Sequence, residues 1–124
     1  MLCVRAVAKV MSGQEPLTYT SSRHGTRSLG RGSIMNLGSI NSYIAAPGMA
    51  PYIASKHAVV GITKSAAMDC MKHHIRVNTA TPLRRPAIAE EVADYIVFLC
   101  SPSASYINGT GLSIDSGITL TAHL

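Results

Sequence analysis

A serine, a tyrosine and a lysine in this sequence have the types and the spacing that proton transfer to a carbonyl oxygen requires. Tyr52 and Lys56 are four positions apart, so on a helix their side chains lie on the same face. Ser39 stands thirteen positions before the tyrosine. A hydroxyl, a phenol and an ammonium group that meet at one place can together bind a substrate oxygen and exchange a proton with it.

The chemistry of carbonyl reduction explains why these residue types belong together. When a hydride adds to a carbonyl carbon, the developing alkoxide needs a proton, but a tyrosine with its ordinary pKa of about 10 exchanges protons slowly near neutral pH. A nearby ammonium group favours the phenolate, so Tyr52 is expected to act as acid in reduction and base in oxidation beside Lys56. Ser39 is expected to hydrogen-bond the substrate oxygen and stabilise its charge in the transition state.

The elements around these residues predict how they come together. The run SIMNL at residues 33–37 is short, apolar and flanked by glycines, which is typical of a strand buried on both faces. A long helix is predicted over residues 51–73, because Pro51 suits a first turn and good helix formers follow it. A second strand is predicted at residues 75–80 and is closed by Pro82, which cannot donate to a ladder.

This order of strand, helix and strand predicts two parallel strands with the helix packed over one face. Open α/β sheets bind ligands outside the carboxyl ends of their strands. Ser39 follows the first strand directly and Tyr52 and Lys56 lie at the start of the helix, so all three are expected at that end of the sheet. A simpler interpretation, in which Tyr52 is a half-buried aromatic and Lys56 a solvated surface charge, stays open.

The rest of the chain completes a small α/β arrangement. Residues 1–12 have the pattern of a helix end, and residues 12–32 are polar and without period, which predicts a long surface loop. A second helix is predicted from about residue 87 to 101, and the segment at 111–115 is a third short strand. The sum is a single domain over residues 1–124 with a partial Rossmann-like, doubly wound fold: three parallel strands with flanking helices.

Composition excludes several other functions. The formal net charge is +5, yet the basic residues are scattered and only Arg84 and Arg85 adjoin, so nucleic-acid binding is not expected. The sequence has no apolar run of membrane-spanning length, and Arg5 and Lys9 interrupt the apolar stretch that a signal peptide would need. The sequence therefore predicts a cytoplasmic protein without a membrane segment.

The cysteines and histidines do not suggest a metal site. The three cysteines are widely separated, and none is paired at the spacing of a zinc site or of a disulfide framework. His73 and His74 are adjacent and would diverge on a helix. No metal is expected, and the thiols are interpreted as buried or inactive groups.

The residues that carry the proton-transfer set also resemble the short-chain dehydrogenase/reductase family. The segment GSIMNLGS resembles the family's fifth strand and its catalytic serine. The segment PYIASKHAVVGITKSAAMDCMKHHIRVNTATP resembles its active-site helix and sixth strand. The segment EEVADYIVFLCSPSASYINGTGLSIDSG resembles its last helix, turn and strand. The resemblance covers nearly everything from residue 31 onward.

This resemblance implies roles that the spacing alone does not give. In the family the matching tyrosine donates the proton, the matching lysine also binds the nicotinamide ribose, and the matching serine orients the substrate. It therefore implies catalytic roles for Ser39, Tyr52 and Lys56, cofactor contacts from Tyr52 and Lys56, and NADP or NAD as cofactor. It also implies a small-molecule alcohol or ketone as substrate, and a homo-oligomer formed through the helices at residues 1–12 and 51–73.

Two departures from the family leave two functions open. No G-x-G-x-x-G turn is found, since Gly25, Gly30 and Gly32 neither follow a predicted strand nor open a helix, so the pyrophosphate-binding first half is expected to be missing. After Pro82, residues 83–86 lead directly into the last helix, so the substrate-covering segment is also expected to be missing. The first function is an NAD(P)-dependent oxidoreductase for a small or polyketide-like alcohol or ketone, in secondary metabolism; the alternative is an inactive truncated relative that serves as an interaction or dimerisation subunit.

Overall fold

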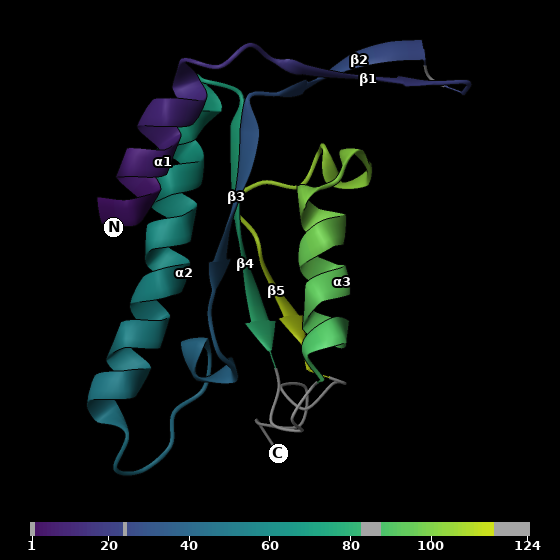
Figure 1. The fold of residues 1–124 in the computed structure, drawn as a ribbon. Coiled ribbons are helices and arrows are strands. Elements are labelled where there is room, and N and C mark those ends of the chain that lie inside the picture. The colour runs from purple at the N-terminus through teal and green to yellow at the C-terminus, as the bar shows by residue number, and fades with distance from the viewer. Residues whose placement is uncertain (1, 24, 83–87, 116–124) are drawn as a thin grey trace.

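The computed structural model describes residues 2–23, 25–82 and 88–115. Figure 1 shows a parallel sheet between two layers of helices, with a hairpin projecting from one end. In chain order the elements are α1 (Leu2–Ser12), β1 (Leu17–Ser21), β2 (Gly25–Gly30), β3 (Gly32–Leu37), η1 (Ile40–Ser42), α2 (Ala50–Met71), β4 (Ile75–Pro82), α3 (Ala89–Cys100), η2 (Pro102–Ala104) and β5 (Gly111–Ile114).

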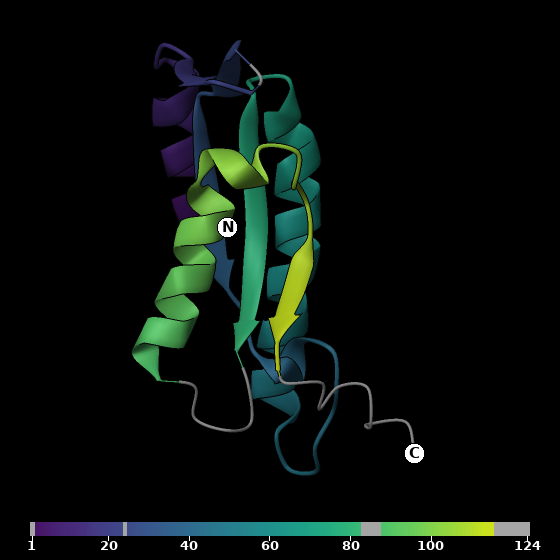
Figure 2. The same ribbon diagram turned by 90° about the vertical axis from the view of Figure 1, so that its right-hand side faces the viewer.

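The sheet has the order β3-β4-β5, and both strand pairs are parallel. Helices α1 and α2 lie on one face and α3 lies on the other, as the two perpendicular views in Figures 1 and 2 make plain. This arrangement confirms the predicted fold class, a partial Rossmann-like fold with three parallel strands and flanking helices. The three predicted strands and the three predicted helices are all present, with ends that differ by one or two residues.

The principal core lies between the sheet and the two helices on its first face. Its members are apolar or thiol side chains from β3, α2 and β4, namely Ile34, Ala67, Cys70, Ile75 and Val77. Helix α1 covers this cluster with Val4, Ala8 and Met11. Burial raises the pKa of the Cys70 thiol, and the nearby charge of Asp69 adds to this effect. Cys70 is therefore a core residue, whereas Cys3 and Cys100 are exposed thiols.

Helix α3 is tied to the other face of the sheet at its carboxyl end. Nη1 of Arg76, on β4, donates hydrogen bonds to the carbonyl oxygens of Leu99 at 2.8 Å and Ile107 at 3.3 Å. A guanidinium at this end is favourable because the last helical carbonyls are unpaired and carry partial negative charge. Burial lowers the pKa of Arg76, while the neighbouring Cys100 acts in the opposite direction.

The prediction of a surface loop at residues 12–32 is wrong over most of that range. Residues 17–21 and 25–30 form an antiparallel hairpin, β1 paired with β2. The Thr20 and Thr26 hydroxyls are 2.7 Å apart across it, and the Arg27 guanidinium lies 5.8 Å from the centroid of the Tyr19 ring. Most of these side chains are exposed. Leu17 and Tyr19 alternate with threonines in β1, but this is only two apolar residues and β2 has no alternation, so the pattern is too short to indicate a half-buried strand. Cross-strand pairs hold this hairpin, and periodicity does not report them.

Asn108 completes the sheet edge where β4 has no strand beside it. Its Oδ1 accepts a hydrogen bond from the Val77 N–H at 2.8 Å, and the next residue, Gly109, donates its N–H to the Val77 carbonyl at 2.9 Å. The side chain therefore replaces a strand neighbour. Buried Asn78, on β4, makes the reciprocal link to the same turn: its Oδ1 accepts a hydrogen bond from the Thr110 N–H at 3.2 Å.

We expect Asn108→Ala to lower the free energy of unfolding by about 1–3 kcal/mol, because the N–H of fully buried Val77 loses its acceptor. Asn108→Asp is the matched control, since a carboxylate keeps an acceptor oxygen at the same place and loses only the longer hydrogen bond from Nδ2 to the Ala67 carbonyl at 3.4 Å. Urea unfolding of the two variants beside the wild type checks this. Equal losses in both variants would contradict the assigned hydrogen bond.

None of the helices in the described ranges combines the length and the apolar character that crossing a membrane requires.

Candidate functional site

The carboxyl end of β3 presents Ser39 in a short, well-bonded turn. The N–H of Gly38 donates to the Ala80 carbonyl at 2.7 Å, which prolongs the parallel ladder up to the serine. Ser39 then caps η1: its Oγ accepts from the Asn41 N–H at 3.3 Å, and its own N–H donates to the Ser42 Oγ at 3.1 Å. Because Oγ is an acceptor in this turn, its proton is available to a substrate oxygen.

Tyr52 and Lys56 lie on the first turns of α2, which begins at Ala50 with Pro51 in its first turn. The Lys56 Nζ is 5.7 Å from the centroid of the Tyr52 ring. Tyr52 is 43% exposed, so its ring is open to a ligand. The structure therefore brings the phenol and the ammonium group together, as the spacing of four predicts.

Ser39 is the N-cap of η1, which packs against α2. Among the described residues, the hydrogen bonds of Ser39 go to its own turn, and none joins it to Tyr52 or Lys56. Ser39 follows the end of β3, and Tyr52 and Lys56 lie in the first turns of α2. The end of β3 and the start of α2 are both at the lower end of Figure 1.

Two other tyrosines, Tyr95 on α3 and Tyr43 after η1, differ in character from Tyr52. The hydroxyl of Tyr95 is buried without a hydrogen-bond partner in the described chain. Burial raises the pKa of Tyr95, and the neighbouring Tyr43 adds to this effect, so Tyr95 is a poor proton donor near neutral pH. Tyr43 instead donates its hydroxyl proton to the Gly111 carbonyl at 3.1 Å. Residue types and spacing do not indicate this bond, because the two residues are 68 positions apart.

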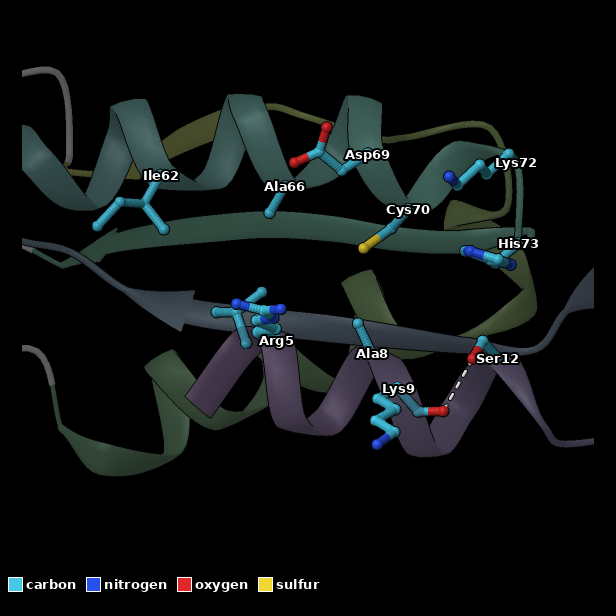
Figure 3. Close-up of a pocket in the computed structure, with 11 residues that line it drawn as sticks. Arg5, Ala8, Lys9, Ser12, Ile62, Ala66, Asp69, Cys70, Lys72 and His73 are labelled. Carbon is cyan, nitrogen blue, oxygen red and sulfur yellow. Dashed lines mark hydrogen bonds between the residues drawn. The ribbon is translucent and has the colours of Figure 1, made fainter. Parts of the chain in front are cut away.

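The most prominent cavities of the described residues lie away from this site. A groove of about 530 Å³ runs between α1 and α2. Figure 3 shows Ala8 on α1 opposite Ala66 and Cys70 on α2, with charged side chains at the rim. A second hollow, about 760 Å³, lies under the base of the hairpin. Neither is lined by Ser39, Tyr52 or Lys56.

The comparisons with known proteins agree with this fold. A family model described as short chain dehydrogenase matches residues 2–84, and one described as enoyl-(acyl carrier protein) reductase matches residues 79–119. The chain belongs to the short-chain dehydrogenase family, whose members are oxidoreductases.

Particular relatives are similar over most of the chain. It is 41% identical to the short-chain dehydrogenase srdC of Neurospora crassa, over 99% of this chain and 55% of the relative. The crystal structure of acetoin dehydrogenase YohF from Salmonella typhimurium is 30% identical with a TM-score of 0.74, over 96% of this chain and 50% of that one. A structure of 4-hydroxyisoleucine dehydrogenase complexed with NADH and succinate is 35% identical with a TM-score of 0.66, over 71% and 44%.

The chain spans about half the length of the curated relatives that it matches. It also lacks positions inside the matched region. The alignment with the Neurospora relative has 150 positions against the 124 residues here, so at least 26 positions of the relative have no counterpart. The predicted gap after Pro82 concerns residues 83–86, which lie outside the described residues.

The residues present fit only one end of a nicotinamide dinucleotide. The exposed phenol of Tyr52 and the ammonium group of Lys56 are polar groups that can hydrogen-bond a ribose. A pyrophosphate is usually bound by a glycine-rich turn between a strand and a helix N-terminus. In the described ranges Gly25 and Gly30 instead belong to the hairpin, and Gly32 opens β3. Among the described residues, Tyr52 and Lys56 offer polar groups to the ribose at the nicotinamide end, and no glycine-rich strand-to-helix turn offers a site for the pyrophosphate.

Proposed function

We propose that this chain carries the proton-transfer set of an NAD(P)-dependent oxidoreductase that interconverts a secondary alcohol and a ketone. The observation that carries the proposal is the Lys56 ammonium group 5.7 Å from the centroid of the half-exposed Tyr52 ring, at the sheet end where Ser39 follows β3. The names of the two structural relatives support the substrate class, because both are dehydrogenases of hydroxylated small molecules.

Each residue has one role in this proposal. The Ser39 hydroxyl donates a hydrogen bond to the substrate oxygen and holds it near the phenol. Tyr52 gives its proton to that oxygen in reduction and takes it back in oxidation. Lys56 stabilises the phenolate left behind and binds the nicotinamide ribose. The bound cofactor supplies or accepts the hydride at the adjacent carbon.

The experiment is a titration of the purified chain with NADH and NADPH, followed by nicotinamide fluorescence, and then assay of turnover on a panel of small ketones. Saturable binding of either cofactor with ketone-dependent oxidation is the expected result. A chain that binds neither cofactor at millimolar concentration cannot catalyse the reaction alone, and the proposal would then fail for the isolated polypeptide.

A second candidate function is association through α1 and α2, as a dimerisation or interaction subunit. The observation that favours it is the groove between these helices, together with exposed apolar side chains on both of them. These side chains are Leu2, Val7, Val10, Met68 and Met71. Apolar surface of this kind is stabilised by burial against another polypeptide, and we propose a second copy or a complete relative as the occupant.

Val10→Glu on α1 is expected to weaken self-association by at least about tenfold, because a carboxylate would be transferred from water into an apolar contact. Val97→Glu on α3 is the matched control, since Val10 is 67% exposed and Val97 is 66% exposed on opposite sides of the sheet. Sedimentation equilibrium over a range of concentrations measures both. A monomeric wild type, or an equal effect of the two substitutions, would contradict the interface.

A further inference from the structure

The segment between Ser39 and Tyr52 must hold a fixed shape if the two residues are to act on one substrate oxygen. It begins with the tight η1 turn, where the N–H of Tyr43 donates to the Ile40 carbonyl at 2.9 Å. It then passes through Gly48, whose φ of 75° is left-handed, before α2 begins at Ala50. The position of Ser39 relative to α2 therefore depends on what fixes this segment to the sheet.

Tyr43, which follows η1 directly, fixes this segment to the sheet. Its hydroxyl donates to the Gly111 carbonyl at 3.1 Å, at the first residue of β5. Strand β4 lies between β3 and β5, and neighbouring strands are about 4.8 Å apart. The tyrosine side chain thus crosses β4 and links the segment after β3 to the far strand of the sheet.

The contact is close enough to restrict the residue on the other side. A Cβ added to Gly111 would overlap the Tyr43 hydroxyl and lie 3.2 Å from Cζ of the same ring and 3.2 Å from Cγ2 of Thr79. Thr79 is fully buried beside this crossing and is paired with Gly111 in the parallel register. A glycine at 111 is therefore what lets the ring lie against the sheet.

We propose that Tyr43 is a positioning residue for the reaction: its bond to Gly111 holds the turn of Ser39 at a fixed place relative to Tyr52 and Lys56. This inference rests on the proposed function. Tyr43 touches neither the substrate nor the cofactor in this scheme. It acts through Ser39, whose hydroxyl must stay within hydrogen-bond reach of an oxygen that Tyr52 protonates.

The experiment compares Tyr43→Phe with the wild type in two measurements. Amide hydrogen exchange of the apo chain is expected to become about tenfold faster over residues 41–44, with the amides of β4 unchanged. In steady-state alcohol oxidation, kcat is expected to fall by about tenfold to a hundredfold, with KM nearly unchanged because the groups that bind the substrate are retained. Gly111→Ala should act in the same direction, since its Cβ displaces the hydroxyl.

Tyr106→Phe is the control, because Tyr106 is fully exposed. It should change neither exchange nor kcat. Exchange that is the same in Tyr43→Phe and in the wild type would overturn the inference whether or not the chain is active. Faster exchange with an unchanged kcat would also overturn it. An inactive wild type would instead count against the proposed function, and hydrogen exchange would still decide whether Tyr43 fixes the segment.

Discussion

Replacing Tyr52 by phenylalanine should lower turnover by about a hundredfold to ten-thousandfold, the range expected when a positioned general acid is lost. The substitution removes one hydroxyl and keeps the ring that faces Lys56. Because the ring is 43% exposed, the free energy of unfolding should change by less than about 0.5 kcal/mol. The loss of activity would then be chemical and not a consequence of unfolding. Steady-state kinetics with the better cofactor, together with urea unfolding, measures both effects.

The other tyrosines provide an internal comparison for this result. Tyr106→Phe alters a fully exposed side chain and should leave turnover as it is. Tyr95→Phe removes a buried hydroxyl that has no partner in the described chain, so it should be neutral or slightly stabilising. Turnover in Tyr52→Phe equal to that of the wild type would exclude the tyrosine as the proton donor, and the site would have to be sought elsewhere.

The sheet and its helices could be predicted because their residues obey simple burial rules. Strand β3 is a short apolar run bounded by glycines, and Ile34 within it is buried. Proline marks the start of α2 within a residue. Strand β4 extends to Pro82, beyond the predicted end at residue 80, because the sheet pairs Pro82 with Ile114 on β5. Proline has no backbone N–H to donate to the ladder, and at the last residue of a strand the loss of that one hydrogen bond costs little.

The parts that could not be predicted depend on contacts between distant residues or on exposed backbone. The hairpin of β1 and β2 has no apolar face, and one of its anchors is a hydrogen bond from Nη2 of Arg27 to the Pro102 carbonyl at 3.0 Å, 75 positions away. Tyr43 likewise donates to a backbone carbonyl. Every residue has such a carbonyl, so the residue type at the acceptor position does not reveal the bond. By contrast, Tyr52 and Lys56 are local neighbours on one helix, so their spacing alone predicts their contact.

The base of the hairpin gives the largest stability effect that we expect. Gly30 has a φ of 79° and is buried where β2 meets the turn between α2 and β4. A Cβ at this position would overlap the His74 carbonyl oxygen and lie 3.1 Å from its carbon. The same carbonyl accepts a hydrogen bond from the Arg31 N–H at 2.8 Å. Gly30→Ala therefore combines left-handed backbone strain with an overlap against fixed backbone, and we expect a loss of about 2–5 kcal/mol.

Gly25→Ala separates these two contributions. Gly25, the first residue of β2, has a similar φ of 65°, but apart from its chain neighbours nothing lies within 4 Å of the Cβ that alanine would add. Its loss should be the backbone strain alone, about 1–2 kcal/mol. Urea unfolding of both variants gives the difference, which measures how tightly the hairpin base is packed against His74. Equal losses would mean that the hairpin is only loosely attached to the sheet. A clearly larger loss in Gly30→Ala would mean that the hairpin base and the turn leading into β4 unfold together.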